Sequence, residues 1–160
     1  MISSTLCSAG PEVFSAAPLL DAPDAAPPLT VAPATNESAL EVLRFLSRRP
    51  LQTVVMSGLI HDNGIVSPFN RGTFFVCRDV NGKIEGVALC GHNTLVEAQN
   101  HAALVALARA ARDHGRRARM IMGEEHVMTD FWKAYAAPEQ KPLHTCVELL
   151  FELRAACGGA

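Results

Sequence analysis

The sequence contains no long apolar run and no excess of charge of one sign. Its 160 residues are 49% hydrophobic and 19% charged, with a formal net charge of -2 at pH 7. No apolar stretch approaches the roughly 20 residues that a membrane-spanning helix needs. The N-terminus also lacks the basic start and continuous apolar core of a secretory signal. These absences argue against a membrane location or a general attraction to nucleic acid, and they predict a single-domain globular protein in the cytoplasm.

Disulfide and metal-binding patterns are also missing. The cysteines are odd in number and lie far apart in the chain, at Cys7, Cys77, Cys90, Cys146 and Cys157. No C-x-x-C or H-x-x-x-H pair occurs, and Cys90 with His92 would supply only two ligands on one face of a strand. We therefore expect buried free thiols and no metal site.

The chain does have a tail followed by a patterned domain. Residues 1–28 are rich in Ala, Pro and Ser and cannot bury enough apolar surface to offset the entropy of ordering, which predicts a flexible tail. A folded domain is expected at 29–153 and a short C-terminal tail at 154–160. The predicted elements are strands at 29–31, 73–77, 84–90, 94–97, 119–122 and 145–153, with helices between Asn36 and Pro50, at 51–60, after Asn100 and through 128–135.

The segment from Thr73 to Arg112 is the centre of the predicted fold. Its first two strands flank Asn81-Gly82, a pair that tolerates positive φ and therefore predicts a β-hairpin. Farther along, Asn100 is a typical cap for a helix with one apolar face. A strand that leads directly into a helix leaves unpaired N–H groups at one point, which is a ready site for an anion such as a cofactor phosphate.

This order of elements resembles the GNAT (Gcn5-related) N-acetyltransferase fold. The similarity lies in the opening 29–35 before a helix, the hairpin, the strand-to-helix step and a later helix that carries Trp132 and Tyr135. The nearer match is similar to a GNAT-like domain at the N-terminus of bacterial two-lobed acetyltransferases, and it rests on residues 59–65, 70–72, 86–92 and 122–124. The resemblance implies an α+β domain with a mixed, mostly antiparallel sheet and helices on both faces.

The resemblance also implies a binding site for acetyl-CoA. Members of the superfamily hold its pyrophosphate with a Q/R-x-x-G-x-G/A loop, in which glycines let the backbone approach the phosphates. The corresponding residues 97–103 contain no glycine, and Glu97 would repel the anion at close range. The cofactor-binding residues implied by the match are Val96, Ala98, Gln99, Asn100 and His101. The alternative is a plain connection capped by Asn100.

Candidate catalytic residues follow from the same resemblance. The superfamily commonly uses a tyrosine to protonate the departing thiolate, and Tyr135 is the only tyrosine in the chain. The register of its helix places Trp132 at the expected position, so Tyr135 has an alternative role as a core aromatic residue. His92, Glu97 and Glu124 are candidates for the general base, and each has the alternative of an ordinary strand-end or loop residue.

Asn63 and Arg71 flank the loop before the hairpin and are the candidate substrate-binding residues. The leading expectation is acyl transfer from an acyl-CoA to an amine, intact or vestigial. The competing expectation is a non-catalytic module that pairs with a catalytic GNAT lobe or with a second copy of itself. A small-molecule sensor that uses the same cleft is a third.

Overall fold

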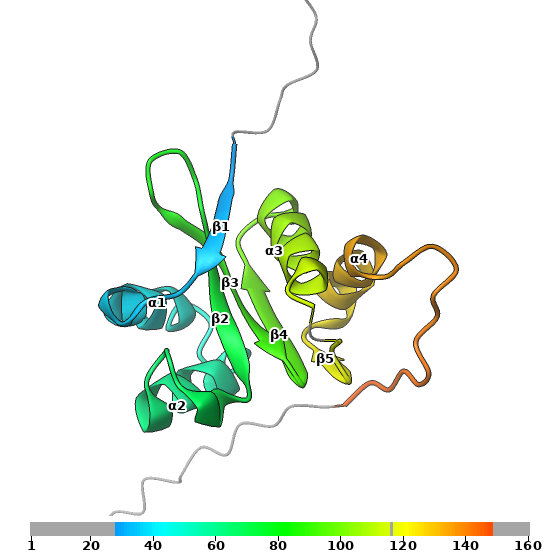
Figure 1. Cartoon of the computed structure of the whole chain (residues 1–160), viewed down its shortest axis with the longest axis horizontal. Coiled ribbons are helices and arrows are strands. Elements are labelled where there is room, and N and C mark those ends of the chain that lie inside the picture. Colours follow the sequence, from blue (N-terminus) through cyan, green and yellow to red (C-terminus); the bar gives the residue numbers. More distant parts are fainter. Residues whose placement is uncertain (1–27, 116, 149–160) are drawn as a thin grey trace, which may run out of the picture.

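A computed structural model describes residues 28–115 and 117–148 of the chain (Figure 1). It contains one five-stranded sheet and four α-helices. In chain order the elements are β1 (Thr30–Pro33), η1 (Asn36–Ser38), α1 (Ala39–Leu46), α2 (Val54–Asn63), η2 (Pro68–Asn70), β2 (Gly72–Arg78), β3 (Ile84–Gly91), β4 (Asn93–Ala98), α3 (His101–Asp113), β5 (Met120–Met122) and α4 (Glu125–Tyr135), where η marks a short 3-10 helix.

The strands lie in the sheet in the order in which they occur in the chain. β1 to β4 pair antiparallel with their neighbours, whereas β4 and β5 pair parallel. The parallel pair follows from α3, because a chain that continues in the same direction in the next strand must first cross back over the sheet. The predicted α+β class, with a mixed and mostly antiparallel sheet, is confirmed.

Each face of the sheet is covered by one pair of helices (Figure 1). Successive residues of a strand point to opposite faces. Accordingly Val87 and Leu89 of β3 belong to the core under α1 and α2, while Ala88 and Cys90 belong to the core under α3 and α4. The prediction of helices on both faces is therefore confirmed.

Local sequence explains the best-predicted elements. The turn between β2 and β3 places Gly82 at a φ of 80°, which glycine adopts without a steric penalty. The side-chain oxygen of Asn100 accepts a hydrogen bond of 2.9 Å from the N–H of Ala103 and caps α3 as predicted. The predicted helix at 51–60 begins and ends three residues later, because Leu51–Thr53 form a turn and Gly64 ends the helix.

The predicted last strand at 145–153 is wrong in the part that the structure describes. Residues 145–148 have no regular structure and are exposed, with Val147 71% exposed. They have no neighbouring strand to bury them, because β5 pairs only with β4 in the described sheet. Cys146 is exposed as well, whereas Cys77 and Cys90 are buried free thiols as expected. Residues 149–153, Cys7, Cys157 and the two predicted tails, apart from Pro28, lie outside the described residues.

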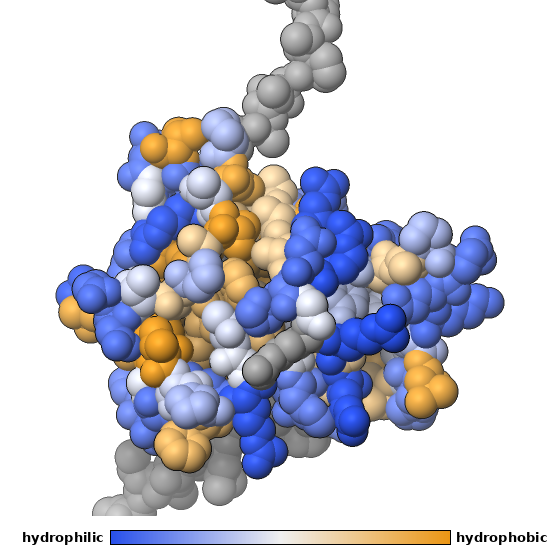
Figure 2. Space-filling view, viewed as in Figure 1, coloured by the Kyte–Doolittle hydropathy of each residue, from blue (hydrophilic) through white to orange (hydrophobic). Residues whose placement is uncertain are grey.

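The surface is uneven in polarity. Figure 2 shows mainly hydrophilic side chains on the outer surface of α3, beside more apolar residues over β1. Among the described helices, none combines the length and the apolar character that crossing a bilayer requires.

Candidate functional site

Glu97 is the only charged side chain among the buried residues of 28–115 and 117–148, with 7% of its surface exposed. It lies near the C-terminal end of β4, opposite Val87 of β3. Because residues opposite each other in a sheet share a face, Glu97 points to the side of α1 and α2. A carboxylate in this position needs a cationic partner to offset the loss of water.

Arg49 is that partner, and it reaches a second carboxylate at the same time. Its Nη1 lies 3.3 Å from Oε1 of Glu97, and its Nη2 donates to Oε1 of Glu124. Arg49 comes from the turn between α1 and α2, while Glu124 lies between β5 and α4. The forked guanidinium thus joins three segments that are far apart in the sequence.

The ion pairs lie just beyond the point where β4 and β5 stop pairing. The last paired residues are Leu95 and Met122. Glu97 lies two positions after Leu95, and Glu124 lies two positions after Met122.

The backbone groups of β4 point alternately toward its two neighbouring strands. The N–H of Gln99 donates to the carbonyl of Glu85 in β3, so the backbone groups of Val96 and Ala98 point the opposite way, toward the side of β5. In the parallel ladder the pairing of Leu95 with Met122 uses the N–H of Val96, so the carbonyl of Val96 and the backbone groups of Ala98 are the first that face a side with no paired strand in the described sheet.

Burial raises the pKa of the Glu97 carboxyl above its ordinary value of 4.5, and the nearby charge of Glu124 adds to the rise, while Arg49 opposes it through its charge and its hydrogen bond. A carboxylate whose pKa is moved toward neutrality is suited to take a proton and release it again. Glu97 is therefore the best-placed candidate base in the described structure.

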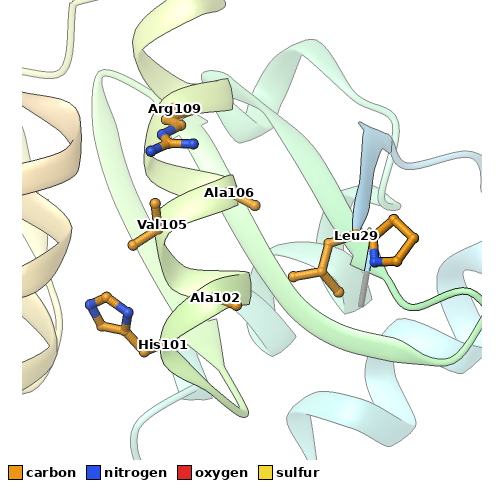
Figure 3. A pocket seen from close by; sticks show the side chains of 7 residues that line it. Leu29, His101, Ala102, Val105, Ala106 and Arg109 are labelled. Atoms are coloured by element: carbon orange, nitrogen blue, oxygen red, sulfur yellow. The ribbon is translucent and has the colours of Figure 1, made fainter. Parts of the chain in front are cut away.

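The N-terminus of α3 carries the predicted phosphate-binding residues. A cavity of about 360 Å³ lies between α3 and Leu29, and Figure 3 shows Ala102 and Ala106 on the side of the helix that faces Leu29. His101 also lines this cavity and a second one of about 470 Å³. The second cavity is lined by the acidic Asp79 and Glu85 as well, and the amide of Asn100 donates to Glu85 at 2.9 Å. These carboxylates oppose an anion on this flank of the helix.

The structure separates the other two predicted catalytic residues from Glu97. His92 lies in the turn before β4, at the opposite end of that strand. At about 3.3 Å per residue, five positions along a strand amount to roughly 16 Å. Tyr135 belongs to the core under α3 and α4, on the other face of the sheet, and its hydroxyl accepts a hydrogen bond of 3.1 Å from the N–H of Ala118. Its ring stacks on Phe131.

Cys90 and His92 do not form a reactive pair. Burial raises the pKa of the Cys90 thiol to about 12, and burial likewise raises that of Cys77 to about 11, with a smaller contribution from the charge of Glu85. A thiol with such a pKa is protonated at neutral pH and is a poor nucleophile. In the described part of the chain, no group of three or more His, Cys, Asp or Glu side chains is placed to hold a metal ion.

Asn63 belongs to a group of hydrogen-bonded polar residues before β2, and Arg71 lies next to this group. The amide of Asn63 donates to Asn70 at 3.1 Å, and the buried amide of Asn70 donates to the carbonyl of Gly64 at 2.9 Å. Arg71 has an exposed side chain and a left-handed φ of 54°, and its carbonyl accepts the N–H of His92. These hydrogen bonds shape the loop that leads into β2.

Arg49 was missed as part of the site, and so was Thr53, whose buried hydroxyl lies 2.8 Å from the carbonyl oxygens of Leu46 and Arg49. The sequence places Arg49 at a helix end, where a cation needs no further explanation. A carboxylate in an otherwise apolar strand does indicate that a cation must lie nearby, but it does not tell which of the 14 Lys and Arg residues it is.

Comparison of the chain with protein-family models, with curated protein sequences and with solved structures finds no match.

Proposed function

We propose that this chain is a GNAT-like N-acetyltransferase domain that transfers an acyl group from an acyl-CoA to an amine at the C-terminal end of β4. The observation that carries the proposal is the early end of the β4–β5 pairing at Leu95 and Met122. It leaves the carbonyl of Val96 and the backbone groups of Ala98 without a paired strand on one side, next to a buried carboxylate and a helix N-terminus. The order of the strands and the crossover by α3 agree with the resemblance in the sequence.

The residues at this end of β4 have groups suited to the reaction. A bound acyl-CoA would supply the acyl group as an activated thioester. The N–H of Ala98 points to the open side of the strand and can donate to a carbonyl oxygen that gains negative charge. The N–H groups of His101 and Ala102 at the start of α3 would hold phosphate, since that of Ala103 already donates to Asn100. Glu97 would accept the proton that the amine loses as it forms the new bond.

The proton for the departing thiol is assigned to water in this proposal. Tyr135 is buried on the other face of the sheet, and its hydroxyl is engaged by Ala118. The chain therefore contributes orientation, a base and backbone donors, and effects of orientation alone account for large rate increases in such transfers.

A second candidate function is a non-catalytic module that pairs with a catalytic acetyltransferase lobe or with another copy of this chain. The observation that favours it is the ion pair of Arg49, which already occupies the carboxylate of Glu97. The glycine-free start of α3 and the acidic lining by Asp79 and Glu85 point the same way. In this case the described fold would be kept for contacts rather than for chemistry.

Isothermal titration of the full chain with acetyl-CoA tests the proposal. We expect micromolar binding that is reduced at least about tenfold, or about 1.4 kcal/mol, in Ala102→Glu. The new carboxylate lies in the first turn of α3, where it suits the helix dipole but repels a phosphate. Ala102→Gln is the matched neutral control and should bind like the parent. Absence of heat at millimolar acetyl-CoA would reject the transferase and favour the pairing module, which sedimentation of the chain would then examine for self-association.

A further inference from the structure

The side chain of Arg49 links β4 and β5 beyond the point where their backbones stop pairing. Its guanidinium bonds to Glu97 near the end of β4 and to Glu124 two residues after β5. These two carboxylates lie two positions past the last paired residues, Leu95 and Met122. A side-chain bridge thus takes over at the point where the ladder of backbone hydrogen bonds stops.

The backbone of Arg49 is itself held in place. The hydroxyl of Thr53 lies 2.8 Å from the carbonyl oxygens of both Leu46 and Arg49, and the N–H of Thr53 donates to the Arg49 carbonyl at 3.1 Å. Thr53 is only 1% exposed. A buried hydroxyl with two close acceptors fixes the turn after α1, so the guanidinium starts from a defined position.

The charged groups around Glu97 come from separate elements. Arg49 reaches it from the turn between α1 and α2, and Glu124 from the segment between β5 and α4. His126, at the start of α4, lies 3.7 Å from Oε2 of Glu124 on the outer side. One guanidinium therefore serves two carboxylates, and its loss would leave two like charges next to each other.

We propose that Arg49 is a positioning residue of this site: its guanidinium closes the end of the β4–β5 pair and holds the Glu97 carboxylate in one orientation and in its ionised form. The role as positioner of a base rests on the proposed function. The bridge itself and its effect on the ionisation of Glu97 do not depend on that function, so they can be tested without a substrate.

The direct test is a titration of the Glu97 side-chain carboxyl by NMR in the full chain, in the parent, Arg49→Met and Arg48→Met. Arg49→Met should raise the pKa of Glu97, because it removes the cation that favours the charged form while Glu124 remains. Arg48→Met is the matched control. It removes the same charge one residue away, from a guanidinium that lies 5.4 Å over the ring of Phe45, and it should leave the titration of Glu97 unchanged.

A second variant should shift the pKa of Glu97 in the opposite direction, and it keeps the proposal testable if Arg49→Met does not fold. Glu124→Gln removes the neighbouring like charge and leaves Arg49 to Glu97 alone, so the pKa of Glu97 should fall. Arg49→Lys keeps the charge but loses the fork, and it should restore the titration only in part.

The proposal is overturned if Glu124→Gln fails to lower the pKa of Glu97, or if the two arginine variants move it equally. These outcomes are separate from the fate of the proposed function. Acetyl-CoA binding together with an unchanged Glu97 titration would remove Arg49 from the mechanism and keep the transferase. The expected titration without acetyl-CoA binding would establish the bridge and reject the transferase.

Discussion

The two ends of β4 are held by different kinds of interaction. At the first end, the N–H of His92 donates to the carbonyl of Arg71, and the His92 carbonyl accepts the N–H groups of Arg119 and Met120 at 3.0 and 3.2 Å. At the other end the backbone pairing with β5 has stopped, and Arg49 bridges two carboxylates instead. The first end is closed by the backbone, and the second is closed only by side chains.

This difference is the reason why the proposed function places the acyl donor at the Glu97 end. Backbone hydrogen bonds between neighbouring strands do not respond to pH near neutrality and leave no room between the strands. A bridge of three charged side chains depends on their ionisation and can open without breaking the sheet. We therefore expect the His92 end to respond mainly to steric changes, and the Glu97 end to respond to charge.

The largest effect is expected from a methyl group at the closed end. A Cβ at Gly91 would meet the carbonyl of Arg71 and would lie 2.6 Å from the Cα of Gly72, both of which are backbone atoms that cannot move aside cheaply. Gly91→Ala should lower the free energy of unfolding by about 3 kcal/mol, measured by chemical denaturation. Gly58→Ala in α2 is the matched control, because nothing lies within 4 Å of its added Cβ. It should stabilise the protein by about 0.5 to 1 kcal/mol. A similar response of the two variants would contradict a tightly closed His92 end.

A smaller effect is expected from the two buried threonines. Thr53→Val removes the hydroxyl that holds the turn of Arg49 with two contacts of 2.8 Å, and it should cost about 1 to 2 kcal/mol. Thr94→Val near the closed end removes contacts of 3.5 Å to Gly91, which are too long to contribute much, and it should cost less than about 0.5 kcal/mol. Thermal unfolding of the two variants measures the two losses of stability. A larger loss in Thr94→Val than in Thr53→Val would contradict the prediction that the threonine at the Arg49 end matters more.

The smallest effect is a change in the pH dependence of stability. Burial raises the pKa of Glu97, so between the unfolded and folded pKa values the folded state binds more protons than the unfolded state. In that range this carboxyl lowers the free energy of unfolding as the pH rises. Glu97→Gln removes the contribution. Its stability relative to the parent should therefore increase when the pH is raised from about 4 to about 7.

Glu41 supplies a control of opposite sign. Its hydrogen bond with Arg78 lowers the pKa of Glu41, so its contribution to stability is present above the unfolded value of 4.5 and is lost as the pH falls through the folded pKa. Glu41→Gln should lose stability relative to the parent over the same rise in pH. Denaturation curves of both variants at several pH values would measure the two changes. If burial did not raise the pKa of Glu97, the attraction of Arg49 would lower it, and both variants would show the same sign.

The sequence was most informative where structure depends on neighbouring residues. The β2–β3 hairpin follows from Asn81-Gly82, and the start of α3 follows from the cap by Asn100, because each is decided within a few positions. The strand predicted at 145–153 was wrong in its described part, since apolar composition alone does not provide a neighbouring strand.

The candidate site could be predicted only in part. Glu97 was one of three candidates for the general base, because it lies near the end of a predicted strand. Its partners could not be assigned, because Arg49 is 48 positions from Glu97 and 75 from Glu124. Only the folded sheet shows that β4 and β5 part beside them, and only the folded core shows that Tyr135 lies on the opposite face.

The most direct test of the account is an NMR titration of the labelled full chain with acetyl-CoA, followed at the backbone amides. We predict that the largest shifts occur at Val96, Ala98 and His101, while the amides of His92 and Thr94 stay unchanged. Shifts concentrated at the His92 end, or none at millimolar acetyl-CoA, would contradict the claim that the Glu97 end of β4 receives the acyl donor.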